Sequence, residues 1–279
     1  MELRILSESP APAARDATMA AEITEHPMRF LSWKTACAAA LSAPLLALAQ
    51  QPSDYAREKR WAGEVVPSIV VGEAVWLEAP RTEKFLGIYT EAKNAKGAIV
   101  LAHGLGVHPD YGLIGELRAR LADAGYTTLS IQMPVLAADA PAARYPVLFW
   151  EADARFAGAV SYLWRKGQRR VVLLSHSMGS RMANHYISSH PQVPLAGWIS
   201  LSISSGEFAP LKRVKFPVYD VYAEKDYDVV LQGAQKRAAL LKRVRGSSQT
   251  MMFATDHFFA KREKELVALI RLLLEGEKR

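Results

Sequence analysis

The sequence contains a single cysteine, Cys37, among its 279 residues. The chain after residue 50 therefore cannot form an internal disulfide or a cysteine-ligated metal site. Glycine (17 residues) and proline (15 residues) are not enriched, and no internal repeat is present, which excludes collagen-like, low-complexity and solenoid architectures. About 50% of the residues are apolar, which is sufficient for one well-buried core in a chain of this length.

Two common ligand-binding motifs are also missing. No histidine pair has the H-E-x-x-H spacing of a zinc site, and no G-x-x-x-x-G-K-[ST] phosphate loop occurs. The net charge is +7, but the basic residues are scattered and form no patch interleaved with aromatic residues, as nucleic-acid binding would require. We therefore expect no metal, no cofactor and no nucleic-acid partner.

Long hydrophobic runs are scarce, and the one that is present lies near the N-terminus. Residues 28–49 combine a basic start (Arg29, Lys34), an apolar run over 35–48 and the small-x-small triplet Ala47-Leu48-Ala49. This is the layout of a signal peptide. The apolar run is shorter than the roughly 20 residues that a membrane-spanning helix needs. We expect a mature chain that begins at Gln50, without a transmembrane span, in the periplasm or outside the cell.

Residues 1–27 do not fit a signal peptide, because they are acidic and rich in proline and alanine. Either translation begins at Met28 and this segment is not made, or it is a disordered extension. The sequence thus predicts three parts: residues 1–27, a signal peptide over 28–49, and one domain over 50–279.

The sequence of this domain alternates between strand and helix patterns. Residues 74–79 and 84–91 are typical of an antiparallel hairpin. The further strands are expected at 97–104, 126–134, 170–175, 195–202, 217–223 and 249–255, and the helices at 112–124, 147–166, 178–188, 231–243 and 259–275. Strands separated by helices predict an α/β fold with a mostly parallel sheet, helices on both faces and antiparallel strands at the N-terminal edge.

Ligands of such sheets bind beyond the carboxyl ends of the strands, and three candidate residues lie there. Ser177 follows strand 170–175, Asp226 follows 217–223, and His257 follows 249–255. A serine hydroxyl becomes a nucleophile when a histidine removes its proton, and a carboxylate orients that histidine. The order Ser, Asp, His along the chain is that of α/β-hydrolases.

The turn that carries Ser177 reads Ser175-His176-Ser177-Met178-Gly179. It departs from the nucleophile-elbow pattern G-x-S-x-G at its first position, where serine replaces glycine. Serine adds only a short side chain, so we interpret the turn as a working elbow, with Gly179 keeping the second close-approach position. The alternative is a small-residue turn without catalytic function.

The acid is less clearly defined than the serine. Asp226 lies just past its strand and is preferred, whereas Asp228 is expected in a solvated loop or at a helix N-cap, and Asp220 lies within the strand. Of the other histidines, His176 occupies the variable position of the elbow. His185 and His190 are expected to be exposed or structural.

An oxyanion hole needs two backbone N–H groups. One is expected from Met178, which follows the serine. The other is expected from Leu105, in the glycine-rich loop where His103 and Gly104 turn the chain after the first parallel strand. The alternative reading of this loop is an ordinary strand–helix connection.

With these residues in place, residues 97–275 resemble an α/β-hydrolase core. The run AHGLGVHPDYGLIGELRARLADAGYTTLSIQMP together with LLSHSMGS more narrowly resembles an uncharacterised bacterial family of exported hydrolase-like proteins, known as a domain of unknown function. The resemblance implies the fold and the positions Ser177, Asp226 and His257. It implies no substrate.

Hydrolases of this kind often carry a cap domain between two of their strands. Here only residues 203–216 separate strand 195–202 from strand 217–223, which leaves no room for a large cap domain there. We expect access to Ser177 to be shaped by loop 134–146 with Tyr145 and by loop 108–111. The favoured function is cofactor-free cleavage of a small or lipid-like ester, or of a thioester or amide. A non-catalytic binding or envelope-assembly protein with the same fold is the alternative; the oligomeric state is open.

Overall fold

The computed structural model describes residues 51–276, to which every structural statement below refers. The expectations for residues 1–27 and 28–49 lie outside this range. Its elements alternate as the sequence predicts, and eight strands form one sheet. The strands are β1 (Glu73–Leu77), β2 (Phe85–Thr90), β3 (Ala98–Ala102), β4 (Thr127–Ile131), β5 (Val171–His176), β6 (Gly197–Leu201), β7 (Val218–Lys225) and β8 (Ser248–Asp256).

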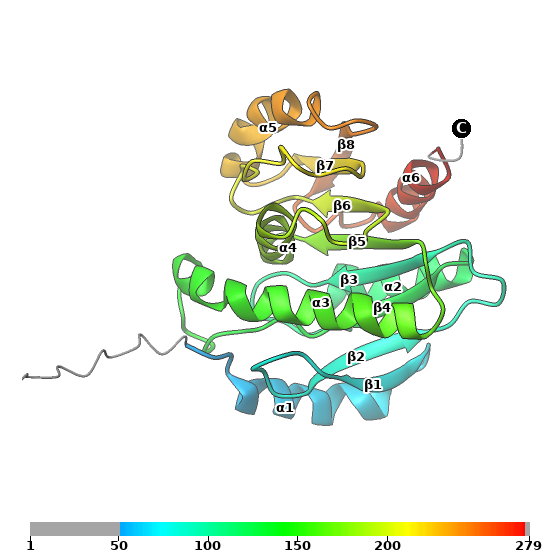
Figure 1. The fold of residues 1–279 in the computed structure, drawn as a ribbon. Helices are drawn as coiled ribbons and strands as arrows, with labels where there is room; N and C mark the ends of the chain where they lie inside the picture. The colour runs from blue at the N-terminus through cyan, green and yellow to red at the C-terminus, as the bar shows by residue number, and fades with distance from the viewer. Residues whose placement is uncertain (1–50, 277–279) are drawn as a thin grey trace, which may run out of the picture. The chain divides into compact units, whose positions relative to one another are not determined.

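The sheet has the order β1-β2-β4-β3-β5-β6-β7-β8. β1 and β2 pair antiparallel, β2 also pairs antiparallel with β4, and all the remaining pairs are parallel. The antiparallel strands therefore lie at the N-terminal edge, as expected. The parallel strands β3 to β8 all point their carboxyl ends toward one edge of the sheet, where ligands of open α/β sheets bind (Figure 1).

Six helices connect and cover the sheet in this part of the chain (Figure 1). They are α1 (Tyr55–Val65), α2 (Gly112–Asp123), α3 (Phe149–Arg165), α4 (Met178–Ser189), α5 (Asp228–Leu241) and α6 (Glu263–Gly276). The sequence analysis did not predict α1. Its signal is visible in retrospect, because Asp54 is an N-cap whose side chain accepts a hydrogen bond from the N–H of Arg57.

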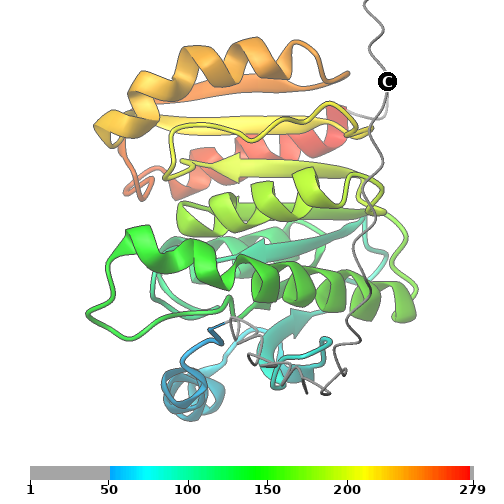
Figure 2. The same cartoon turned by 60° about the vertical axis from the view of Figure 1, so that its left-hand side comes forward.

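The core lies in two layers, one on each face of the sheet. Alternate residues of β3 point to opposite faces: Val100 packs with α3 and α4, whereas Ile99 and Leu101 pack with α2 and α6. Figure 2 shows α3 and α4 in front of the sheet and α6 behind it. Strands buried on both faces are continuous apolar runs, which is why the sequence of β3 shows no alternation.

The connection between β6 and β7 is short and forms no cap domain, as expected. The segment after β4 differs from expectation, because residues Ala142–Leu148 form a 3-10 helix before α3. Between residues 51 and 276, no helix combines the length and the apolar character that a membrane crossing requires.

Candidate active site

The three residues singled out in the sequence each follow directly on the last residue of a strand. Ser177 follows β5, Asp226 follows β7 and His257 follows β8. Because these strands are parallel, their carboxyl ends bring the three side chains together. Nε2 of His257 lies 2.9 Å from Oγ of Ser177, and Nδ1 of His257 lies 2.6 Å from Oδ1 of Asp226. All three residues are buried.

The carboxylate of Asp226 is held by several donors. Ser202 and the N–H of Ala223 donate to Oδ2, and the N–H of Tyr227 donates to Oδ1. Burial alone would raise the pKa of Asp226, but the hydrogen bonds from His257, Ser202 and Ala223 lower it below its usual value. The carboxylate is therefore ionised and accepts the Nδ1 proton of His257, which leaves Nε2 free to accept the proton of Ser177.

The other two aspartates have different surroundings. Asp228 is exposed in the first turn of α5, where a negative charge is favourable. Asp220 is fully buried and pairs with Arg237 (Nε to Oδ2, 2.7 Å). This pair lies between β7 and α5, so Asp220 contributes to packing and not to the cluster at the sheet edge.

Ser177 has the backbone conformation of a strained turn, with φ 56° and ψ −114°. Positive φ is uncommon for a residue with a side chain and often occurs at functional sites. Gly179 permits the close approach of α4 to β3, since a Cβ there would lie 2.4 Å from the carbonyl oxygen of His103 and 2.8 Å from that of Ala102. A Cβ on Gly104 would lie 3.4 Å from the Cβ of Ser177, so this residue keeps the space beside the serine open.

Ser175 does more than provide a small side chain. Its Oγ accepts a hydrogen bond from Nε1 of the fully buried Trp198 (2.8 Å) and lies 3.1 Å from Oγ of Ser180. Glycine at position 175 would leave the indole N–H of Trp198 buried without this partner. The serine that departs from the elbow pattern is thus explained by the tryptophan on the neighbouring strand β6.

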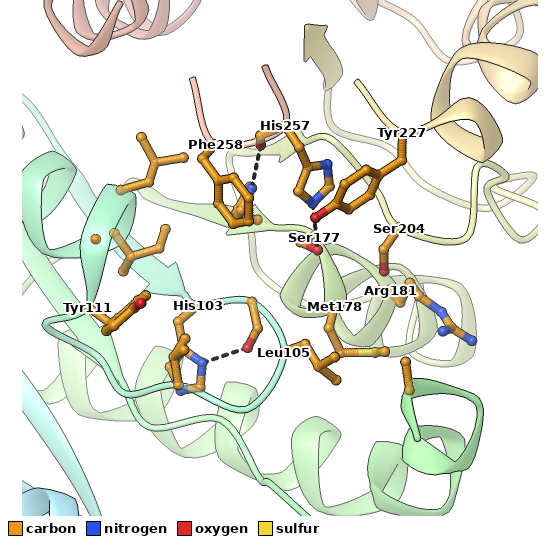
Figure 3. A pocket seen from close by; sticks show the side chains of 17 residues that line it. His103, Leu105, Tyr111, Ser177, Met178, Arg181, Ser204, Tyr227, His257 and Phe258 are labelled. Carbon is orange, nitrogen blue, oxygen red and sulfur yellow. Dashed lines mark hydrogen bonds between the residues drawn. The ribbon is translucent and has the colours of Figure 1, made fainter. Parts of the chain in front are cut away.

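The two backbone donors expected for an oxyanion hole come from different elements. Met178 is the first residue of α4, where an N–H has no partner within the helix. Leu105 lies in the loop after β3, and both residues line the cavity beside Ser177 (Figure 3). Leu105, Met178 and Ser177 thus line the same cavity, and the role of the two N–H groups as oxyanion donors stays a prediction.

His103 fixes the loop that carries Leu105. Its Nδ1 lies 2.9 Å from the carbonyl oxygen of Gly104, and its Nε2 lies 2.9 Å from the N–H nitrogen of Met133. A carbonyl only accepts and a backbone N–H only donates, so His103 carries its single proton on Nδ1. Burial lowers the pKa of His103 to about 3, which keeps the ring neutral.

The helix α1 supports the same loop from the other side. Arg57 donates to the carbonyl oxygen of Gly106 (2.9 Å) and to that of Leu136 (2.7 Å). Glu58, on the same helix, forms a buried ion pair with Arg155 of α3, which also donates to the carbonyl oxygen of Gln132. The unexpected helix therefore connects the loop after β3 to the segment after β4.

Two residues that the sequence analysis did not assign to the site contact His257. Nε2 of His176 lies 2.9 Å from the carbonyl oxygen of His257, and the ring of Tyr227 stacks on the imidazole with centroids 3.9 Å apart. Burial, then the neighbouring His257, lowers the pKa of His176 to about 4, so His176 is neutral and donates from Nε2. His176 directly precedes Ser177, and Tyr227 directly follows Asp226. This adjacency is the only sequence signal that the two residues belong to the site.

A cavity of about 810 Å³ opens onto Ser177. Its walls come mainly from the loop after β3, the start of α2, the elbow and the loops that carry Tyr227 and Phe258 (Figure 3). Tyr111 of loop 108–111 and Ala142 of the segment before α3 also line it, in agreement with the loops expected to shape access. Tyr145 does not line it, because its ring is buried in the core and its hydroxyl faces the N–H of Leu136.

His185 and His190 stand apart from this cluster. His185 on α4 contacts Asp153 (3.0 Å), which raises the pKa of His185 through the hydrogen bond. His190 lies just past the end of α4, and its Nδ1 is 3.1 Å from the carbonyl oxygen of Tyr186. Among residues 51–276, no cluster of three or more histidine, cysteine or acidic side chains has the arrangement of a metal site.

Comparison with solved structures identifies the architecture. A dienelactone hydrolase from Anabaena variabilis matches with a TM-score of 0.60 and 19% identity, covering 73% of this chain and 96% of the other. Est1E from Butyrivibrio proteoclasticus matches with 0.56 and 12% (74% and 99% covered). A serine hydrolase without lid from Xanthomonas campestris matches with 0.55 and 14% (75% and 95% covered). At these identities the likeness shows the fold, which is that of the α/β-hydrolases.

Comparison with proteins of curated function gave no match. The sequence itself matches a protein family over residues 5–148, which is more than half of the chain. This family is described as a protein of unknown function, DUF3530. The match includes the loop with His103, Gly104 and Leu105 and ends before the elbow. The chain belongs to the DUF3530 family and has the α/β-hydrolase fold.

Proposed function

We propose that this protein is a serine hydrolase that cleaves an ester, or a thioester or amide, through an acyl-enzyme intermediate. The observation that carries the proposal is the continuous chain of hydrogen bonds from Ser177 through His257 to Asp226, beside a cavity that Ser177 and His257 line. The strained φ of Ser177, and the presence of Met178 and Leu105 in the lining of the same cavity, support the same function. The fold alone would not support it, because one fold hosts many functions.

In the proposed reaction, Oγ of Ser177 attacks the substrate carbonyl carbon while its proton passes to Nε2 of His257. Asp226 stabilises the imidazolium that forms. The carbonyl oxygen becomes an oxyanion and accepts hydrogen bonds from the N–H groups of Met178 and Leu105. His257 then gives its proton to the leaving alkoxide, and the acyl group stays on Ser177.

In the second half of the reaction, a water molecule replaces the alcohol. His257 removes a proton from this water as the oxygen attacks the acyl carbon, and the proton then returns to Ser177 as the acid leaves. Every step uses groups of this chain. Esters are favoured over amides, since their better leaving groups need no acid catalyst beyond His257.

A fluorophosphonate probe tests the proposal directly. Such probes react with a nucleophilic serine beside an oxyanion hole, so we expect labelling at Ser177 and turnover of p-nitrophenyl butyrate. Ser177→Ala should abolish both, while the thermal midpoint holds or rises, because residues kept for activity often cost stability. Ser189→Ala, an exposed serine at the far end of α4, is the matched control and should leave both unchanged.

The same experiment distinguishes the proposed function from the alternative. A wild type that folds but shows neither labelling nor turnover would favour a binding or envelope-assembly protein with a hydrolase fold. Labelling that persists in Ser177→Ala would assign the nucleophile to another residue.

We further propose that the chain is exported through a signal peptide over residues 28–49, on the strength of its basic start, apolar run and small-x-small triplet. N-terminal sequencing of the protein recovered from the envelope or medium should give Gln50 as the first residue. Recovery of the chain from the cytoplasm with residues 28–49 still attached would contradict export.

A further inference from the structure

The cavity beside Ser177 has two chemically different sides. Figure 3 shows Tyr111 on one side of Ser177 and Arg181 with Ser204 on the other. Tyr111 belongs to the same segment as the apolar residues Val107, Leu113 and Ile114, which also line the cavity, and Phe258 lies on the same side of Ser177 as Tyr111 (Figure 3). A substrate that fills the cavity therefore meets an apolar surface on one side and a cation with a hydroxyl on the other.

Arg181 is the only arginine, lysine, aspartate or glutamate among the described residues that line the cavity. It lies on α4, one turn after Ser177, and is half-buried. Its guanidinium carbon lies 5.8 Å from the ring centroid of Phe149. Burial lowers the pKa of Arg181, but a guanidinium remains charged at any physiological pH.

No acidic side chain neutralises Arg181 within residues 51–276. Asp153, on the neighbouring helix α3, contacts His185 (3.0 Å) and His190 (3.7 Å) of the segment that follows Arg181. A cation that is partly removed from water without a counter-ion raises the free energy of the folded protein. An anion that binds in the cavity would offset this cost.

Ser204 gives a second, independent indication. Its hydroxyl oxygen is buried and has no hydrogen-bond partner in the part of the chain that the structure describes. Its N–H donates to the carbonyl oxygen of Ser177 (3.4 Å), so the residue lies directly beside the nucleophile. A buried hydroxyl without a partner is costly, and it is available to donate to a bound group.

We propose that Arg181 and Ser204 form a subsite for a carboxylate of the substrate, so that the natural substrate is an anionic ester with an apolar part on the opposite side. The inference rests on the proposed function of Ser177. A planar guanidinium matches the geometry of a carboxylate and can donate two parallel hydrogen bonds to it. One cation in the cavity matches one negative charge, which favours a carboxylate over a doubly charged phosphate monoester.

Two pairs of esters test this subsite, because each pair differs by one negative charge. Monophenyl adipate and phenyl hexanoate carry or lack the carboxylate on the acyl side. 4-(Butanoyloxy)benzoate and 4-(butanoyloxy)benzamide carry or lack it on the alcohol side. We expect the wild type to prefer the anionic member of one pair in kcat/KM, and this preference identifies the side that faces Arg181.

Substitutions then connect the preference to the residues. Arg181→Gln should lower the anionic-to-neutral ratio of kcat/KM by about 10- to 100-fold, as expected for loss of a charged hydrogen bond. Arg181→Lys should restore part of it, and Ser204→Ala should lower it by about 2- to 10-fold. Arg213→Gln removes an equal charge from an exposed position outside the cavity and should leave the ratio unchanged.

A binding measurement makes the inference independent of catalysis. In the Ser177→Ala background, calorimetry should show that monophenyl adipate or 4-(butanoyloxy)benzoate binds more tightly than its neutral counterpart, and that Arg181→Gln removes the difference. Equal binding of the charged and neutral esters in both pairs would overturn the subsite. Turnover of all four esters without preference would also overturn it while leaving the proposed hydrolase function intact.

Discussion

His257 is in contact with three residues from two other segments of the chain. Asp226 accepts its Nδ1 proton, Tyr227 stacks on its face, and His176 donates to its backbone carbonyl oxygen. A general base must keep its orientation relative to the hydroxyl that it deprotonates. These contacts hold both the ring and the backbone of His257, so that Nε2 faces Ser177 before any substrate binds.

The role of Asp226 is testable because a second aspartate lies two residues away. Asp226→Asn removes the charge that selects the tautomer and stabilises the imidazolium, so kcat should fall by about 10⁴-fold. Asp228→Asn, at an exposed site in the first turn of α5, should change kcat little. Steady-state kinetics with p-nitrophenyl butyrate and a thermal unfolding curve for each variant decide the matter. The reverse ranking would assign the acid to Asp228.

At the same scale, the sequence predicted which residues meet but not all of their partners. Ser177, Asp226 and His257 could be found because each follows a recognisable strand. Some contacts join residues at neighbouring strands, such as Ser175 with Trp198 and Asp226 with Ser202. No local sequence pattern predicts these contacts. Tyr145 was misplaced for a related reason, since an aromatic residue in a loop can point into the core as readily as into a cavity.

At the scale of elements, the elbow depends on how closely α4 approaches β3. Gly179→Ala would place a Cβ 2.4 Å from the carbonyl oxygen of His103, far inside van der Waals contact with rigid backbone. The helix must then move away from the strand, which shifts Met178 and its N–H relative to the loop of Leu105. We expect fluorophosphonate labelling and ester turnover to fall by at least about 10²-fold, as when one oxyanion donor is lost.

A glycine elsewhere in the same fold provides the control for this prediction. A Cβ on Gly63 in α1 would meet nothing within 4 Å, so Gly63→Ala should keep labelling and be neutral or slightly stabilising. Thermal unfolding of both variants distinguishes a displaced active site in a folded protein from a loss of folding. Full labelling of Gly179→Ala would mean that the close approach is not needed for reactivity.

The order of strands and helices could be predicted because hydrophobic periodicity is strong in buried parallel strands and in the helices that cover them. The helix α1 was missed because its apolar residues are few and polar residues such as Arg57 and Glu58 make its decisive contacts. Buried ion pairs such as Glu58 with Arg155 join residues almost a hundred positions apart. Such long-range polar contacts depend on the finished fold and leave no periodic trace in the sequence.

At the scale of the whole molecule, two buried neutral histidines make stability depend on pH. The pKa of His176 is lowered to about 4 and that of His103 to about 3, mainly by burial, whereas histidines of the unfolded chain titrate near 6.5. Between these values the unfolded chain binds protons that the folded protein does not. The free energy of unfolding should therefore fall as the pH drops from about 6.5 toward 4, by about 1.4 kcal/mol per pH unit for each histidine.

Urea unfolding at several pH values between 7 and 4.5 measures this slope, and a variant isolates one contribution. His176→Gln keeps an N–H donor but does not titrate, so its free energy of unfolding should decline less steeply by about 1.4 kcal/mol per pH unit. The buried carboxyls of Glu58 and Asp220, whose pKa values burial raises, act in the opposite direction but equally in both proteins. Parallel curves for the wild type and His176→Gln would show that His176 is protonated in the folded protein as readily as in the unfolded chain.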